Sequence, residues 1–122
     1  MINILIVEDD PNARMGLVMG LRHHDGYQVQ AVPTGEAALE MLRAQGEDVD
    51  LLILDYMLPG IDGIETCSHI RQFSKVPIIF LSASGEDDTV ISALERGADD
   101  YLVKPVRIVT ERAQGRFRHN QC

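Results

Sequence analysis

The segment 51–63, LLILDYMLPGIDG, decides the fold of this chain. Its first four residues are large and aliphatic, and an unbroken apolar run is typical of a strand covered on both faces, as in a parallel sheet. The run ends at Asp55, and the glycine-containing pairs 59–60 and 62–63 then supply turn chemistry. The segment therefore predicts a buried strand that carries a carboxylate to one edge of a parallel sheet.

Four further apolar runs flank this segment, and amphipathic stretches separate them. The runs cover residues 2–7, 27–32, 77–82 and 101–103. In run 27–32, apolar residues alternate with two glutamines, which predicts an edge strand with one wet face. Strands that alternate with helices in this way predict an α/β domain with a five-stranded parallel sheet and right-handed crossovers.

The stretches between the runs predict helices from their apolar spacing and from the residues at their starts. The first begins at Pro11 and extends to about residue 24, and the second follows Thr34 as its N-cap. The later helices are predicted to begin at 62 or 63 and at 87 or 88, the latter closed by Gly97, and a fifth segment begins at 105.

The composition is that of one soluble globular domain. The chain has 122 residues, of which 45% are hydrophobic and 25% charged, and this argues against disorder. The apolar start 2–7 is too short for a signal peptide or a membrane span, so we expect a cytoplasmic protein with no membrane contact. Cys67 and Cys122 are too few for a disulfide framework or a zinc site.

The charge is negative and unevenly placed. The net charge of −8 argues against nucleic acid as a direct partner of this domain, because phosphate would be repelled. Residues 1–105 hold seven basic and eighteen acidic residues, whereas residues 106–122 hold four basic and one acidic residue. This distribution leaves room for a DNA-binding output supplied by another domain.

Polar side chains follow four of the five predicted strands. The acidic triplet 8–10 follows the first, Asp55 ends the third, Ser82 ends the fourth and Lys104 follows the fifth. The carboxyl ends of parallel strands share one edge, so the carboxylates should meet there and repel one another unless a cation offsets their charge. Oxygen ligands predict Mg²⁺, with Mn²⁺ as a substitute. Asp10 fits a helix cap equally well.

These motifs resemble the receiver domain of bacterial two-component response regulators, including the chemotaxis type. The resemblance covers residues 1 to about 106 and rests on five separated motifs in order. It implies a doubly wound sheet with the flavodoxin-like strand order 2-1-3-4-5 and helices on both faces. It also implies that 1–122 is a single receiver domain with its core in 1–106. Because 107–122 has no leucine and contains a glycine, we expect an atypical last helix or a tail there.

The resemblance also assigns roles to the site residues. It implies that Asp55 accepts a phosphoryl group, and that the protein is a signalling phosphoacceptor rather than an enzyme, although it assists its own phosphorylation and dephosphorylation. The other implied roles are metal binding by Glu8, Asp9, Asp55 and the backbone carbonyl of Met57; phosphoryl binding and switching by Ser82, Ala83, Lys104 and Tyr101; and loop geometry set by Pro105.

The implied phosphodonor is a sensor histidine kinase or a phosphotransfer protein. A homodimer through the fourth helix, fifth strand and fifth helix is the second implied contact. Phosphorylation is then expected to change the surface that meets partners or an output domain.

Three other functions compete with this interpretation. A phosphatase of the haloacid dehalogenase type needs Asp-x-Asp on its first strand, whereas Asp55 lies on the third and lacks the second acid. A flavin-binding module needs a Ser/Thr/Gly-rich loop after the first strand, where the acids 8–10 would repel the flavin phosphate. A receiver-like domain that is never phosphorylated would lack a required residue, and here none is missing.

Overall fold

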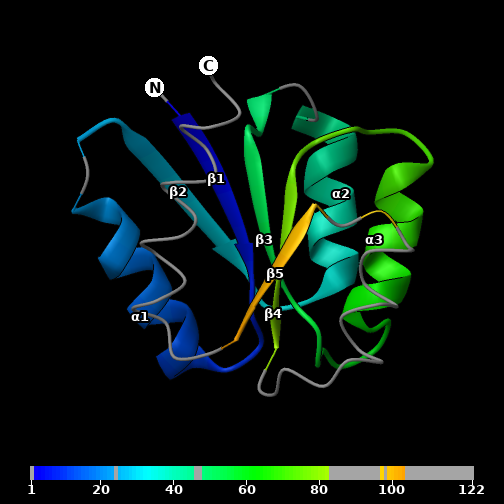
Figure 1. Cartoon of the computed structure of the whole chain (residues 1–122), viewed down its shortest axis with the longest axis horizontal. Coiled ribbons are helices and arrows are strands. Elements are labelled where there is room, and N and C mark those ends of the chain that lie inside the picture. Colours follow the sequence, from blue (N-terminus) through cyan, green and yellow to red (C-terminus); the bar gives the residue numbers. More distant parts are fainter. Residues whose placement is uncertain (1, 24, 46–47, 83–96, 98, 104–122) are drawn as a thin grey trace.

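The computed structural model describes residues 2–23, 25–45, 48–82, 97 and 99–103. Its elements in chain order are β1 (Ile2–Val7), α1 (Pro11–Arg22), β2 (Tyr27–Val32), α2 (Gly35–Gln45), β3 (Leu51–Asp55), α3 (Gly63–Arg71), β4 (Ile78–Ser82) and β5 (Asp100–Val103) (Figure 1). All five predicted strands and the first three predicted helices are confirmed. The predicted fourth and fifth helices fall outside these residues.

The element ends differ from the predictions by one or two residues. The strand predicted from 77 begins at Ile78, because Pro77 has no N–H to give to the ladder. The Pro77 carbonyl still accepts a hydrogen bond from the Leu52 N–H at 2.9 Å. The first helix ends at Arg22 rather than near residue 24, with His23 as its C-cap.

The sheet has the predicted order, β2-β1-β3-β4-β5, and all four strand pairs are parallel. The chain leaves β1 toward β2 on one side and returns to β3 on the other, so β1 and β3 flank the point where the winding reverses. Ligands of open α/β sheets bind at the carboxyl ends of the strands at this point. The topology therefore directs attention to residues 8 and 55.

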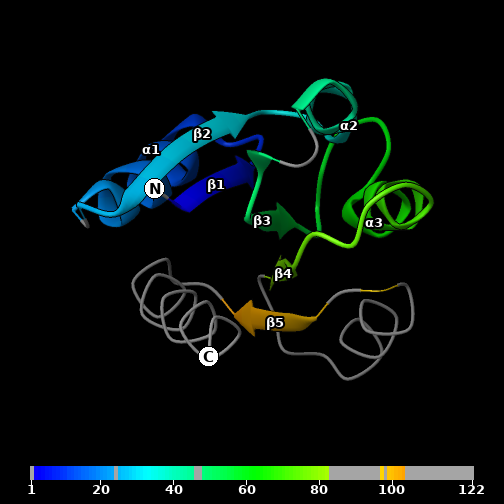
Figure 2. The same cartoon turned by 90° about the horizontal axis from the view of Figure 1, so that it is seen from above.

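The helices cover both faces of the sheet, with α1 on one side and α2 and α3 on the other (Figure 2). Leu17 and Leu21 of α1 pack on one face, and Leu42 of α2 and Ile70 of α3 pack on the opposite face. All five residues of β3 are buried. This confirms the central strand that the segment 51–63 predicts.

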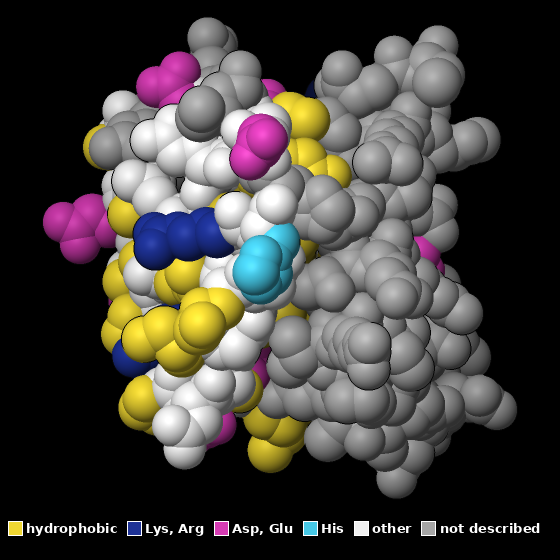
Figure 3. Space-filling view, turned by 90° about the vertical axis from the view of Figure 1, so that its left-hand side faces the viewer, with side chains coloured by type: hydrophobic (Ala, Val, Ile, Leu, Met, Phe, Trp, Pro, Cys, Tyr) yellow, Lys and Arg dark blue, Asp and Glu magenta, His cyan; other side chains and the backbone are white. Residues whose placement is uncertain are grey.

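The outer surface of α1 carries exposed apolar side chains. Met15 and Met19 are each 59% exposed, and their spacing of four residues places them side by side on the helix. Figure 3 views the molecule from the side where α1 and β2 lie, and apolar side chains are visible there among charged ones. Among the described helices, none is long and apolar enough to cross a membrane.

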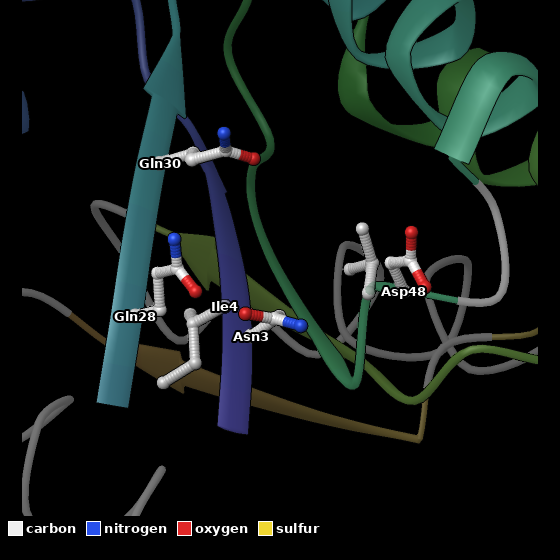
Figure 4. Close-up of a pocket in the computed structure, with 6 residues that line it drawn as sticks. Asn3, Ile4, Gln28, Gln30 and Asp48 are labelled. Carbon is white, nitrogen blue, oxygen red and sulfur yellow. The ribbon is translucent and has the colours of Figure 1, made fainter. Parts of the chain in front are cut away.

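Strand β2 is the edge strand that its glutamines predict. Val29 is buried, whereas Gln28 and Gln30 are exposed. With Asn3 and Asp48, these glutamines line a polar hollow of about 190 Å³ (Figure 4). Because the hollow lies near the amino ends of β1 and β3, it is separate from the carboxyl edge where the candidate site is sought.

The start of α2 offers a local test of the fold. The Thr34 hydroxyl accepts a hydrogen bond from the Ala37 N–H at 3.1 Å, which confirms Thr34 as a cap. We expect Thr34→Ala to lower the free energy of unfolding by about 1 kcal/mol, because it leaves a helix N–H without its partner. Urea denaturation measures this loss. Thr34→Ser keeps the hydroxyl and should stay close to wild type, so an equal loss in both variants would count against capping.

Candidate functional site

Three carboxylates meet at the carboxyl edge of β1 and β3. Val7 pairs with Leu54, so the residues that follow them, Glu8 and Asp55, lie side by side at this edge of the sheet. One carboxylate oxygen from each of Glu8, Asp9 and Asp55 lies within 4.8 Å of the other two. The structure thus brings Asp55 next to an acidic pair that lies more than forty residues earlier in the sequence.

The burial of these side chains makes their charge costly. Glu8 and Asp55 are only 1% and 4% exposed, whereas Asp9 is exposed and leaves the site open to solvent. Negative charges within 4.8 Å of one another repel, and burial strengthens this repulsion because it lowers the local dielectric constant. A donor set made only of carboxylate oxygens fits a hard divalent cation such as Mg²⁺ or Mn²⁺, whose charge would offset the repulsion.

The loop between β1 and α1 is fixed by short-range hydrogen bonds. The Glu8 N–H donates to the Val32 carbonyl at 3.1 Å, and the Asp10 N–H donates to Glu8 Oε2 at 3.3 Å. The Asp10 carboxylate accepts from the Ala13 N–H at 3.0 Å as the N-cap of α1. Of the two roles that the sequence leaves open for Asp10, the structure therefore assigns it the helix cap.

The loop after β3 is also held in place by short-range hydrogen bonds. The Met57 N–H donates to Asp55 Oδ1 at 3.3 Å, and the Tyr56 carbonyl accepts from the Gly63 N–H at 3.1 Å. Asp62 caps α3 by accepting from the Glu65 N–H at 2.8 Å. These bonds hold the Asp55 carboxylate at the end of its strand. Metal binding by the Met57 carbonyl stays a prediction.

The remaining predicted site residues are described only in part. Ser82 ends β4, one position beyond Leu81, which pairs with Asp55, so the backbone brings Ser82 to the same edge. Tyr101 lies in β5 and pairs with Phe80. The side chains of Ser82 and Tyr101 lie outside the described part of the chain, as do Ala83, Lys104 and Pro105 entirely.

Two contacts of the site escaped the sequence reasoning. Nη1 of Arg14 donates to the Glu8 carbonyl at 3.0 Å and to the Asp9 carbonyl at 3.4 Å. Glu36 Oε2 accepts from the Ile61 N–H at 3.4 Å, in the loop after Asp55. The contact of Arg14 could have been predicted from its position in the first turns of the helix. Side chains of a helix lean toward its N-terminus, which here places Arg14 near the loop before α1.

Cys67 can be set aside as a reactive group. It lies on the buried face of α3, and this burial raises the pKa of its thiol. The charge of Arg71 lowers that pKa and the charge of Asp99 raises it, both by less than burial does. A thiol with a raised pKa is a poor nucleophile at neutral pH. The chemistry of the described residues therefore lies with the carboxylates.

Known proteins resemble this chain in sequence over most of its length. The profile of the family described as "Response regulator receiver domain" matches residues 4–112. Transcriptional regulatory protein AfsQ1 of Streptomyces coelicolor is 42% identical over 121 residues, which make up 98% of this chain and 52% of that protein. The chain spans about half the length of the curated relatives it matches.

Solved structures agree in fold. A two-component response regulator from Clostridium difficile superposes with a TM-score of 0.89 at 27% identity and covers 100% of both chains. The Mn²⁺-bound form of response regulator Rcp1 gives a TM-score of 0.78 at 27% identity and covers 94% of this chain and 91% of that one. The chain belongs to the response regulator receiver domains, the signalling modules of two-component systems.

Proposed function

We propose that this domain is a phosphoacceptor that takes a phosphoryl group onto Asp55 from a sensor histidine kinase or a phosphotransfer protein. The observation that carries this proposal is the meeting of Glu8, Asp9 and Asp55 at the switch point of the sheet, with oxygens within 4.8 Å of one another. A core has no need of such a cluster, because buried like charges destabilise a fold.

The proposed transfer is a direct displacement at phosphorus. An oxygen of the Asp55 carboxylate forms the new bond, and the bond from phosphorus to the donor nitrogen breaks. The electron pair stays with the donor imidazole, which leaves as a neutral ring when its other nitrogen already carries a proton. A carboxylate is a weak nucleophile, but it forms acyl phosphates when it is held in position. The Met57 N–H supplies part of that positioning through its contact with Asp55 Oδ1.

Glu8 and Asp9 are the proposed cation ligands beside Asp55. A bound Mg²⁺ would supply charge stabilisation, on which phosphoryl transfer depends more than on proton transfer. The proposal is supported by the all-oxygen donor set and by the fold shared with the Mn²⁺-bound response regulator Rcp1. Mn²⁺ is expected to substitute for Mg²⁺.

The remaining predicted residues are proposed to read the phosphoryl group. Ser82 and Lys104 would contact it, with Ala83 and Tyr101 taking part in the switch and Pro105 holding the loop. Support comes from the strand register, which brings the backbone of Ser82 to the edge that holds Asp55.

The boundaries and partners are proposals of the same standing. We propose one receiver domain over 1–122 in a cytoplasmic protein, with a homodimer face on the fourth helix, β5 and the fifth helix. The names of relatives such as the transcriptional regulatory protein AfsQ1 support an output in transcription through another part of a longer protein.

Labelling of the wild-type chain by acetyl phosphate tests the proposal. We expect one phosphoryl group per chain in the presence of Mg²⁺ and none with excess EDTA, because the carboxylates then repel the anionic donor. Intact-mass spectrometry measures the product. Absence of the label from folded protein saturated with Mg²⁺ would overturn the proposed function, and steady release of inorganic phosphate from a phosphomonoester would favour a phosphatase instead.

A further inference from the structure

Arg14 connects helix α1 to the backbone of the two acidic residues before it. Its Nη1 donates to the carbonyl oxygens of both Glu8 and Asp9, at 3.0 and 3.4 Å. We propose that Arg14 is a positioning residue for the cation site: it holds the backbone of Glu8 and Asp9 so that their carboxylates face Asp55. This inference rests on the proposed function, because it assumes that the carboxylates bind a cation.

The helix gives Arg14 a firm base. The Arg14 N–H donates to the Asp10 carbonyl at 2.9 Å, and one turn further along, Leu17 is fully buried against the sheet. The guanidinium is therefore carried by a docked helix while it contacts the loop. Asp9 benefits most, because its side chain is exposed and is not held by surrounding packing.

The charge of Arg14 and its geometry should act on a cation in opposite directions. A positive charge near the site repels Mg²⁺ and lowers its affinity, with a strength set by distance and dielectric. The planar guanidinium, in contrast, places two N–H bonds of one nitrogen in fixed directions and so can hold two carbonyls at once. A lysine keeps the charge but replaces this fork with a mobile point donor.

Two substitutions separate these effects. Arg14→Lys keeps the repulsion and loses the fork, whereas Arg14→Met loses both. If Arg14 positions the ligands, Arg14→Lys should bind Mg²⁺ roughly tenfold more weakly than wild type, which is the lower end of the cost of removing a partner outside the ligand set. The Mg²⁺ affinity of Arg14→Met should lie between those of wild type and Arg14→Lys, because removing the positive charge offsets part of the affinity lost with the two hydrogen bonds.

Arg22 provides a matched control on the same helix. Its Nη2 also donates to a backbone carbonyl, that of Val29 at 3.2 Å, but at the other end of α1. Arg22→Lys therefore removes the same kind of contact far from the carboxylates, and its Mg²⁺ affinity should equal that of wild type.

The experiment is a titration of each ¹⁵N-labelled protein with MgCl₂, followed through the amide signals of Asp10 and Met57. Both amides donate to carboxylates of the cluster, so they report on the site itself. Urea denaturation in EDTA, run in parallel, measures any general loss of stability. A purely structural Arg14 would lower the free energy of unfolding and leave the Mg²⁺ affinity unchanged.

The outcomes separate the inference from the function on which it rests. A wild-type affinity in Arg14→Lys, or tighter binding in Arg14→Met than in wild type, overturns the positioning role while the metal site stands. A wild-type chain whose amides do not respond to Mg²⁺ overturns the proposed metal site. If Arg14→Met does not fold, the comparison of Mg²⁺ affinity between Arg14→Lys and Arg22→Lys still tests the positioning role of Arg14.

Discussion

The Asp55→Asn variant will not acquire a phosphoryl group from acetyl phosphate under conditions that label the wild-type chain. An amide has no anionic oxygen to attack phosphorus. Glu8 and Asp9 are proposed to hold the cation, so they are not expected to accept the phosphoryl group in place of Asp55. We therefore expect the label to fall below detection by intact-mass spectrometry, which makes this the largest expected functional effect.

Asp62→Asn is the matched control for this variant. Asp62 lies in the same loop region but caps α3 through the Glu65 N–H, outside the three-carboxylate cluster. Asparagine caps helices about as well as aspartate, so Asp62→Asn should fold normally and take the label. A labelled Asp55→Asn chain would show that the phosphoryl group goes elsewhere.

The Asp55→Asn variant also measures the electrostatic repulsion among the three carboxylates. Without divalent cations, Asp55→Asn should raise the free energy of unfolding by about 1 kcal/mol or more, since it removes one of three negative charges whose oxygens lie within 4.8 Å of one another. Added Mg²⁺ should stabilise wild type and have little effect on the variant. An Asn variant that is less stable than wild type in EDTA would contradict this account.

The Gly63→Ala variant will lose about 2 to 3 kcal/mol of unfolding free energy, the cost of forcing atoms into a filled space. A Cβ at Gly63 would meet the Asp55 carbonyl oxygen, the Phe80 ring at 2.8 Å and the Cα of Tyr56 at 2.9 Å. Two of these neighbours are backbone atoms, which cannot swing aside as a flexible side chain can. The loop after Asp55 must then shift, so phosphorylation should weaken as well.

Gly16→Ala controls for the replacement of glycine itself. Gly16 lies in the interior of α1, and a Cβ built there meets nothing within 4 Å. Alanine favours a helix over glycine by up to about 1 kcal/mol, so this variant should be as stable as wild type or more so. Urea denaturation of both variants tests the contrast, and equal losses would contradict the packing argument at Gly63.

Much of the fold was readable in the sequence because its signals are local. The apolar run before Asp55 predicted a strand that is buried throughout, and Thr34 and Asp62 were recognisable helix starts. The strand order came from the resemblance to receiver domains, and the parallel sheet then placed residues 8 and 55 together.

The contacts that hold the site could not be read in the same way. The segment around Gly63 was predicted as a turn that opens the third helix, and α3 does begin at Gly63. Its close packing against the backbone of Asp55 was not predicted, whereas Gly60, with φ of 73°, has the turn conformation that was expected. Such close approaches depend on how β3, β4 and α3 pack together. The contact from Arg14 likewise depends on the path of the loop between β1 and α1.

Because β1 pairs with β3, the site cannot form in a fragment that lacks either strand. The contact from the Asn3 N–H to Asp50 Oδ2 at the start of these strands already closes a loop of 47 residues. Closing such a loop costs chain entropy, which only the assembled sheet can repay. A peptide spanning 51–63 would carry the proposed acceptor carboxylate without either of its acidic neighbours. The chemistry proposed for Asp55 therefore depends on cooperative folding of the domain.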